Sequence, residues 1–327
     1  MNKISLADVA RALDGLIDSQ MTAQARITAH LVAAAEAAGH DAARLIATLD
    51  DVAAQTVVDE FWISDEHGVV YITTVRDESG APMPFRFDPD PAVQPQASAF
   101  HVLLASSVDS DDVVTQEAQV REIDQAVYKY AGVSGIDRQR IVQVGNALAF
   151  EEQVSQSNAY ASPVMTSVLA AFDVPELLSD TYTSEYAEIR PIFEEILGKQ
   201  MIVQAMLAER FAAAAEEAGW PAEGINSRLR RIVRSTPIGE IHIVGRDGAV
   251  LYTSLEPLPG ELPNSGDLGP LLDGSQQAAD RQTAPRASDG AMYKYVATGG
   301  GGSPRLVQVG LPIPDSSPVS PRFAGNL

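Results

Sequence analysis

The sequence predicts an α+β protein built from two tandem domains, each with a long N-terminal helix packed on an antiparallel sheet. Two observations predict this class. The chain of 327 residues is internally repeated, so that the elements of its first half recur in the same order in its second half. Each copy opens with apolar residues at helical spacing and continues with β-rich runs around short polar turns.

The repeat begins with a match at an offset of 180 residues. Residues 21–40 (MTAQARITAHLVAAAEAAGH) and 201–220 (MIVQAMLAERFAAAAEEAGW) are identical at nine of twenty positions. The match continues without a gap, from residues 57–74 to residues 237–254. Two long copies of this kind are tandem domains and not a solenoid, which stacks many short repeats.

A second match lies at an offset of 165 residues. Residues 126–145 and 291–310 both contain YKY followed by VQVG, and they are identical at ten of twenty positions. Because the offset falls by fifteen between the two matches, the first copy has fifteen extra residues. We expect these extra residues between positions 75 and 126.

Each copy starts with two predicted helices. In the first copy, apolar residues recur at steps of three and four along the first helix, at Leu13, Leu16, Ile17, Met21, Ile27 and Leu31. Gly39 and Gly219 stand where this helix would end. A shorter helix follows, and its apolar positions correspond between the copies: Leu45, Leu49 and Val52 in one, Ile225, Leu229 and Ile232 in the other.

Two predicted hairpins follow the helices in each copy. The first covers residues 57–74 or 237–254, with a polar turn that ends in glycine. A proline-rich segment of variable sequence comes next. The YKY and VQVG strands then form the second hairpin. The expected order is therefore helix, helix, strand, strand, irregular segment, strand, strand.

Composition excludes several classes of function. The net charge of −21 argues against nucleic acid and against an anionic membrane surface as partners. The chain has no cysteine, which excludes disulfides and thiolate chemistry. We find no signal peptide and no apolar run long enough to span a membrane. These features predict a cytoplasmic protein, or a periplasmic or extracellular one if the chain is a sensor region cut from a longer protein.

The sequence does not indicate an enzyme. The five histidines show no spacing typical of a zinc site, and no serine nucleophile motif is present. Asp109, Asp111 and Asp112 lack the glycine and glutamate of a calcium loop. We therefore predict no catalytic residues, no metal and no cofactor.

The motifs of the two copies resemble those of the Cache domain, a PAS-like sensor module of bacterial chemoreceptors and sensor kinases. The resemblance is carried by the long helix, the strand that leads into DEHGVVY or GRDGAVLY, and the hairpin with YKY and VQVG. It divides the chain into a first Cache-like domain, a helical linker, a second Cache-like domain and a flexible tail, at residues 1–150, 151–182, 183–316 and 317–327.

The resemblance implies a small-molecule ligand. In Cache domains one face of the sheet packs on the long helix, and the variable segment folds over the other face to form a pocket. Members that bind amino acids share an Arg-x-Trp pair in that segment, whereas this chain has Phe85-Arg86-Phe87. We therefore do not carry amino-acid specificity over to it.

Tyrosine and lysine alternate in the YKY strand, so Tyr128 and Tyr130 share one face and Lys129 lies on the other. We expect the tyrosines to face the lid at 81–101 and line the pocket, although core packing would give the same pattern. Lys129 either lies on the outer face, paired with a helix carboxylate, or points inward to hold a carboxylate ligand.

The first copy is the better candidate for a working pocket. Its longer middle segment combines aromatic residues, histidine and arginine, and an inward Arg86 would favour an anionic ligand such as a small carboxylate. The predicted ligand-binding residues are Trp62, Phe85, Arg86, Phe87, His101, Tyr128 and Tyr130. In the second copy they are His242, Tyr293 and Tyr295.

These observations predict a sensory module of bacterial signal transduction that binds a small molecule in its first domain. One alternative is an adaptor with degenerate pockets, whose alanine-rich long helices pair in a homodimer. A second alternative is an enzyme on a PAS-like scaffold. The absence of cysteine and the scattered histidines argue against the enzyme.

Overall fold

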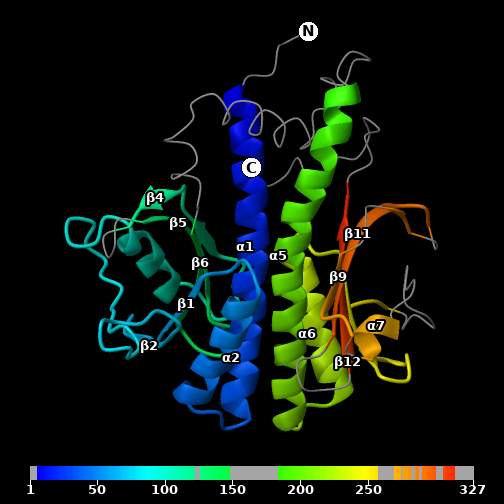
Figure 1. The fold of residues 1–327 in the computed structure, drawn as a ribbon. Coiled ribbons are helices and arrows are strands. Elements are labelled where there is room, and N and C mark those ends of the chain that lie inside the picture. Colours follow the sequence, from blue (N-terminus) through cyan, green and yellow to red (C-terminus); the bar gives the residue numbers. More distant parts are fainter. Residues whose placement is uncertain are drawn as a thin grey trace.

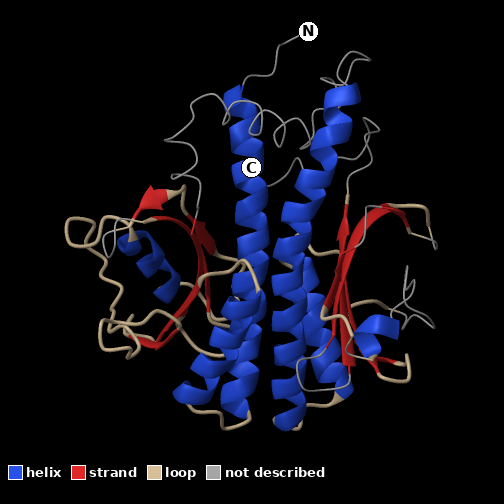
Figure 2. Cartoon of the chain, viewed as in Figure 1, coloured by secondary structure: helices blue, strands red, loops and turns tan. Residues whose placement is uncertain are grey.

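Two long helices stand side by side at the centre of the molecule, and an antiparallel sheet lies on the outer side of each (Figures 1 and 2). The computed structural model describes residues 6–121, 126–147, 183–256, 269–273, 275–280, 284–286, 289–299 and 305–313. The long helices are α1 (Leu6–Ala37) and α5 (Thr183–Glu217), and both start at the same end of the molecule (Figure 1).

A short helix follows each long helix across a tight turn. Gly39 and Gly219 have φ angles of 82° and 75°, in the left-handed region that glycine adopts without steric cost. Helix α2 (Ala42–Gln55) then begins with Asp41, whose carboxylate accepts a hydrogen bond from the Arg44 backbone N–H at 2.8 Å. Helix α6 (Ala222–Arg234) follows Pro221 in the second copy.

The first sheet has the strand order β2-β1-β6-β5-β3, with β4 also paired to β5. A 3₁₀ helix, η1 (Ala97–Leu104), packs on the face of this sheet that is turned away from α1. The strands are β1 (Glu60–Ser64), β2 (Val70–Thr73), β3 (Val113–Thr115), β4 (Gln119–Val120), β5 (Val127–Ser134) and β6 (Ile141–Ala147).

The second sheet repeats this order as β10-β11-β12-β7-β8, with β9 also paired to β11. The pairing shifts register at the same place in both first hairpins, after Ile63 and after Ile243. The elements are β7 (Glu240–Gly245), β8 (Val250–Thr253), α7 (Gly269–Leu272), β9 (Ala278–Asp280), β10 (Ala284–Pro285), β11 (Met292–Gly299) and β12 (Arg305–Pro312).

The predicted fold class is confirmed: each copy is a long helix on one face of an antiparallel sheet. Residues 57–74 and 237–254 contain the first hairpins as predicted. The offset is already 165 between β3 and β9, so the fifteen extra residues lie between β2 and β3. The predicted linker and tail, 151–182 and 317–327, lie outside the described residues.

One hydrophobic core runs through both copies. It joins apolar side chains of α1 and α5 with the inner faces of the two sheets, for example Ile27, Phe61, Leu207 and Ile241. The small side chains of the alanine-rich stretches, such as Ala34 and Ala215, are buried in it. The partner of α1 along this length is therefore α5 of the same chain, and a homodimer through the long helices stays a prediction.

Buried glutamines connect the two long helices in a symmetric pattern. Gln24 Nε2 donates to Gln200 Oε1 at 2.6 Å, and Gln204 Nε2 donates to Gln20 Oε1 at 2.7 Å. Gln20 and Gln200 occupy equivalent positions of the repeat, as do Gln24 and Gln204. The two bonds are thus related by an approximate two-fold axis, as in a symmetric dimer interface.

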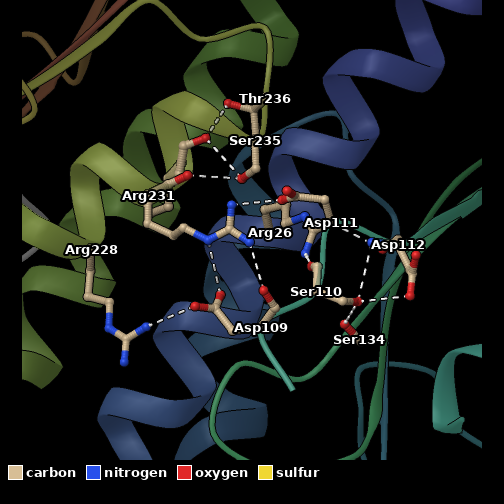
Figure 3. A network of polar contacts seen from close by, with 11 residues as sticks. Arg26, Asp109, Ser110, Asp111, Asp112, Ser134, Arg228, Arg231, Ser235 and Thr236 are labelled. Atoms are coloured by element: carbon tan, nitrogen blue, oxygen red, sulfur yellow. Dashed lines mark hydrogen bonds and ion pairs between the residues drawn. The ribbon is translucent and has the colours of Figure 1, made fainter. Parts of the chain in front are cut away.

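A loop of the first copy, residues 105–112, is tied to the second copy by arginines (Figure 3). Arg231 of α6 donates to the Asp109 carbonyl at 2.7 Å and pairs with the Asp111 carboxylate at 2.7 Å. Arg26 of α1 donates to the carbonyl oxygens of Ser110 and Asp112. The aspartates of this loop are therefore partners of arginine at the contact between the copies.

Neither long helix, nor any other helix in the described part of the chain, carries an apolar run that could cross a membrane.

Candidate functional site

A glutamate, a glycine and a tyrosine lie in one row across the first sheet. Gly145, the last residue of VQVG, pairs with Glu60 on one neighbouring strand and with Tyr130 on the other. The Tyr130 hydroxyl donates to Glu60 Oε1 at 2.5 Å across the glycine. A β-carbon at position 145 would lie 2.5 Å from the Tyr130 ring, so the row requires glycine there.

Arg121 completes this cluster. Its guanidinium donates to Glu60 Oε2 at 2.6 Å and lies 3.7 Å from the centre of the Tyr128 ring. The Trp62 indole N–H donates to Glu60 Oε1 at 2.9 Å. Glu60 and Arg121 are both buried, so the carboxylate is stabilised by three donors where water is excluded.

The tyrosine of the cluster is held in its neutral form. Burial raises the pKa of Tyr130 well above its ordinary value, and the neighbouring Glu60 carboxylate raises it further. The hydroxyl is thus a hydrogen-bond donor to Glu60 and not a source of negative charge.

The second copy contains the same cluster. Glu240 accepts from the Tyr295 hydroxyl at 2.6 Å and from Arg286 at 2.7 Å, with Gly310 between glutamate and tyrosine. Arg286 lies 4.4 Å from the centre of the Tyr293 ring. The cluster is therefore a feature of the repeated domain and holds three strands of each sheet in register.

A cavity of about 50 Å³ lies beside the cluster in the first copy, between the sheet and η1. Aromatic rings form much of its wall, and amide side chains bring hydrogen-bonding groups. The lining residues are Trp62, Phe85, Phe87, Gln94, Gln96, Ala97, Phe100, Gln116, Arg121, Tyr130 and Gln143. Of these, η1 contributes Ala97 and Phe100.

Four of the seven residues predicted for the first pocket line this cavity: Trp62, Phe85, Phe87 and Tyr130. Tyr128 stacks on Tyr130, with ring centres 5.7 Å apart, and lies under Arg121. Its role is therefore to support the Tyr130 ring and the guanidinium. His101 is half-buried on η1 and is not among the lining residues. Whether any of these residues binds a ligand stays a prediction.

The inward orientation expected of Arg86 is wrong. Its side chain is exposed, and its Nε donates to the His67 carbonyl at 3.3 Å. Phe85 and Phe87 on either side turn toward the sheet and pack on each other at 5.2 Å. Exposing the guanidinium avoids the cost of burying an unpaired charge among aromatic rings. The expectation of an anionic ligand, which depended on Arg86, loses its basis.

The lysines of the two YKY strands face the long helices, as the alternation predicted, but they are buried and not solvated. Lys129 pairs with Asp18 of α1 at 2.9 Å. In the second copy Gly198 replaces this aspartate, and Lys294 pairs with Asp280 of β9 at 2.5 Å. The helix carboxylate was the expected partner in the first copy only.

The residues predicted for the second pocket also come together. Tyr293 and Tyr295 stack at 5.6 Å, and His242 takes the place that Trp62 has in the first copy. The His242 ring accepts from or donates to Thr253 Oγ1 at 2.9 Å. All three side chains are buried.

Sequence reasoning missed Glu60 and Arg121 as members of the site. The offset of 165 could have found the arginine, because Arg121 falls on Arg286 seven positions before the tyrosine of each copy. Gln143 and Gln308, the glutamines of VQVG, correspond in the same way. Glu60 and Glu240 were visible as a repeated pair, but only the strand register places them beside Tyr130 and Tyr295.

Replacing Gly145 by alanine is expected to lower the free energy of unfolding by about 1–3 kcal/mol. The new methyl group would overlap the Tyr130 ring and separate its hydroxyl from Glu60. Gly15→Ala is the matched control, because this exposed position in α1 has no atom near the new methyl group. It should be neutral or slightly stabilising. Denaturant titrations of both variants measure the difference, and equal stability of the two would contradict the role of Gly145.

Comparisons with known proteins give low similarity throughout. The sequence matches no family model and no curated protein. The ligand-binding domain of the Campylobacter jejuni chemoreceptor Tlp3 with L-norvaline is similar at 8% identity, over 94% of this chain and 87% of that chain, with a TM-score of 0.30.

Two further solved structures are similar to the same degree. The sensory domain of Tlp3 matches at 9% identity over 94% of this chain and 89% of that chain, with a TM-score of 0.28. An extracellular ligand-binding receptor from Desulfohalobium retbaense matches at 13% identity over 94% of this chain and 39% of that chain, with a TM-score of 0.23. At such scores the similarities carry no inference about a ligand.

Proposed function

We propose that this chain is a Cache-type sensory module that binds a small molecule in the cavity of its first copy. The observation that carries the proposal is the cavity itself, between η1 and the face of the sheet turned away from α1. This is the face on which the resemblance to Cache domains places the ligand. Aromatic walls with a few converging polar groups are typical of small-molecule sites.

The position of the cavity supports a sensory role. Its lining includes Ala97 and Phe100 of η1 on one side of loop 105–112 and Gln116 on the other. That loop is fixed to α1 by Arg26 and to α6 of the second copy by Arg231. A ligand that shifts η1 would therefore change contacts with both copies, provided it binds the two positions of η1 with different affinity.

A thermal-shift screen against metabolites tests the proposal. A ligand that binds the folded chain raises its melting temperature, and more so at a larger excess over the dissociation constant. The panel should contain charged and uncharged compounds alike. Ala97→Leu adds three carbon atoms to the cavity wall, whereas Val102→Leu changes an exposed residue of the same helix.

A ligand of the cavity should stabilise the wild type and Val102→Leu but not Ala97→Leu. If no compound does so, or if Ala97→Leu responds as the wild type does, the sensory proposal fails. The adaptor role would then be favoured, since α1 and α5 already pair within the chain.

A further inference from the structure

The cavity offers no net charge to a ligand. Among the described residues that line it, Arg121 is the only one with a charged side chain. Its guanidinium pairs with Glu60 at 2.6 Å, and both groups are buried. The positive charge beside the cavity is thus already neutralised by the protein.

A charged ligand would disturb this pair. A carboxylate would compete with Glu60 for Arg121 and leave the buried glutamate with less compensation. An ammonium group would lie beside the guanidinium, while Glu60 already accepts hydrogen bonds from Trp62, Arg121 and Tyr130. Burying either charge without a partner is costly. An uncharged ligand avoids both costs.

The lining supplies groups that suit an uncharged polar ligand. Four glutamines surround the cavity: Gln94, Gln96, Gln116 and Gln143. Two of their polar atoms, the donor Gln96 Nε2 and the acceptor Gln116 Oε1, are buried without a hydrogen-bond partner. Buried polar groups nearly always have a partner, from the protein or from a bound molecule. A carboxamide has both an acceptor and a donor and could serve as partner to each.

The size of the cavity limits the group that enters it. A volume of about 50 Å³ has room for roughly four non-hydrogen atoms. We propose that the cavity binds the uncharged carboxamide end of a small molecule, held between aromatic walls and the glutamine side chains. This inference rests on the proposed function, because it assigns a ligand class to the same site.

Trp62 allows the proposal to be tested by fluorescence. It lines the cavity and is one of only two tryptophans in the chain. Replacing the other by phenylalanine (Trp220→Phe) leaves Trp62 as the single tryptophan. Acetamide, acetate and ethylammonium serve as probes of similar size that differ in charge. Ligands this small bind weakly, so each titration should extend to ~100 mM at constant ionic strength.

Acetamide is expected to shift the Trp62 emission in a saturable way, with an apparent affinity at least tenfold above those of the two ions. The response should persist when Val102→Leu is added and disappear when Ala97→Leu is added. The inference is overturned if an ion binds as well as acetamide, if acetamide has no effect, or if Ala97→Leu leaves its response intact.

The inference can fail while the proposed function stands. A charged metabolite that stabilises the wild type and not Ala97→Leu in the thermal-shift screen would show a working cavity of the wrong ligand class. A screen without any cavity-dependent compound would reject both.

Discussion

Glu60→Gln is expected to lower the free energy of unfolding by about 3–5 kcal/mol, since it removes one charge from a buried pair. Glutamine keeps an oxygen for the hydroxyl of Tyr130 and the indole of Trp62. Its amide group, however, would face the Arg121 guanidinium, which would lose its carboxylate partner. Denaturant titrations followed by circular dichroism measure the loss.

Two controls separate the buried pair from ordinary charge effects. Glu217→Gln breaks the pair with Arg44 on the surface, where both side chains are about half exposed, and should cost less than about 1 kcal/mol. The double variant Glu60→Gln/Arg121→Met removes both buried charges and should recover much of the loss. A single variant as stable as the wild type, or a double variant with fully additive losses, would contradict this account.

Acidification is expected to weaken the contact between the two copies through His30. This histidine is fully buried on α1, and its ring lies 5.8 Å from Phe211 of α5. Burial, with smaller contributions from Arg228, Arg26 and Arg231, lowers the pKa of His30 from 6.5 to about 3. In the unfolded chain the pKa returns to about 6.5.

The direction of the effect follows from proton linkage. Between pH 6.5 and pH 3 the unfolded chain binds more protons at position 30 than the folded chain does. Stability from this residue is therefore complete above pH 6.5 and falls as the pH decreases through the window. From pH 7 to pH 5 the loss amounts to roughly 2 kcal/mol, at 1.36 kcal/mol per pKa unit.

His30→Leu isolates this contribution. The variant keeps an apolar side chain against Phe211, and all other titrating groups are shared with the wild type. The free energy of unfolding, measured from pH 7 to pH 5, should fall more steeply in the wild type than in the variant, by about one proton. Parallel curves would show that His30 is not held neutral at the contact between the copies.

The sequence by itself determined the repeated architecture. Apolar spacing and turn residues predict the helices and hairpins, because the period of a pattern depends only on local backbone geometry. Strand alternation likewise placed Tyr130 on one face and Lys129 on the other. Even the position of Arg121 was encoded, since the offset of 165 aligns it with Arg286.

The tertiary structure decided the rest, because it depends on which distant residues the strand register and the helix contacts bring together. Glu60 and Tyr130 are seventy residues apart in the chain, and they meet only because Gly145 lies between them in the register of three strands. Arg86 could face either side of an irregular segment, which has no alternation to fix it. The pairing of α1 with α5 came from burial of two apolar faces that each copy alone would leave exposed to water.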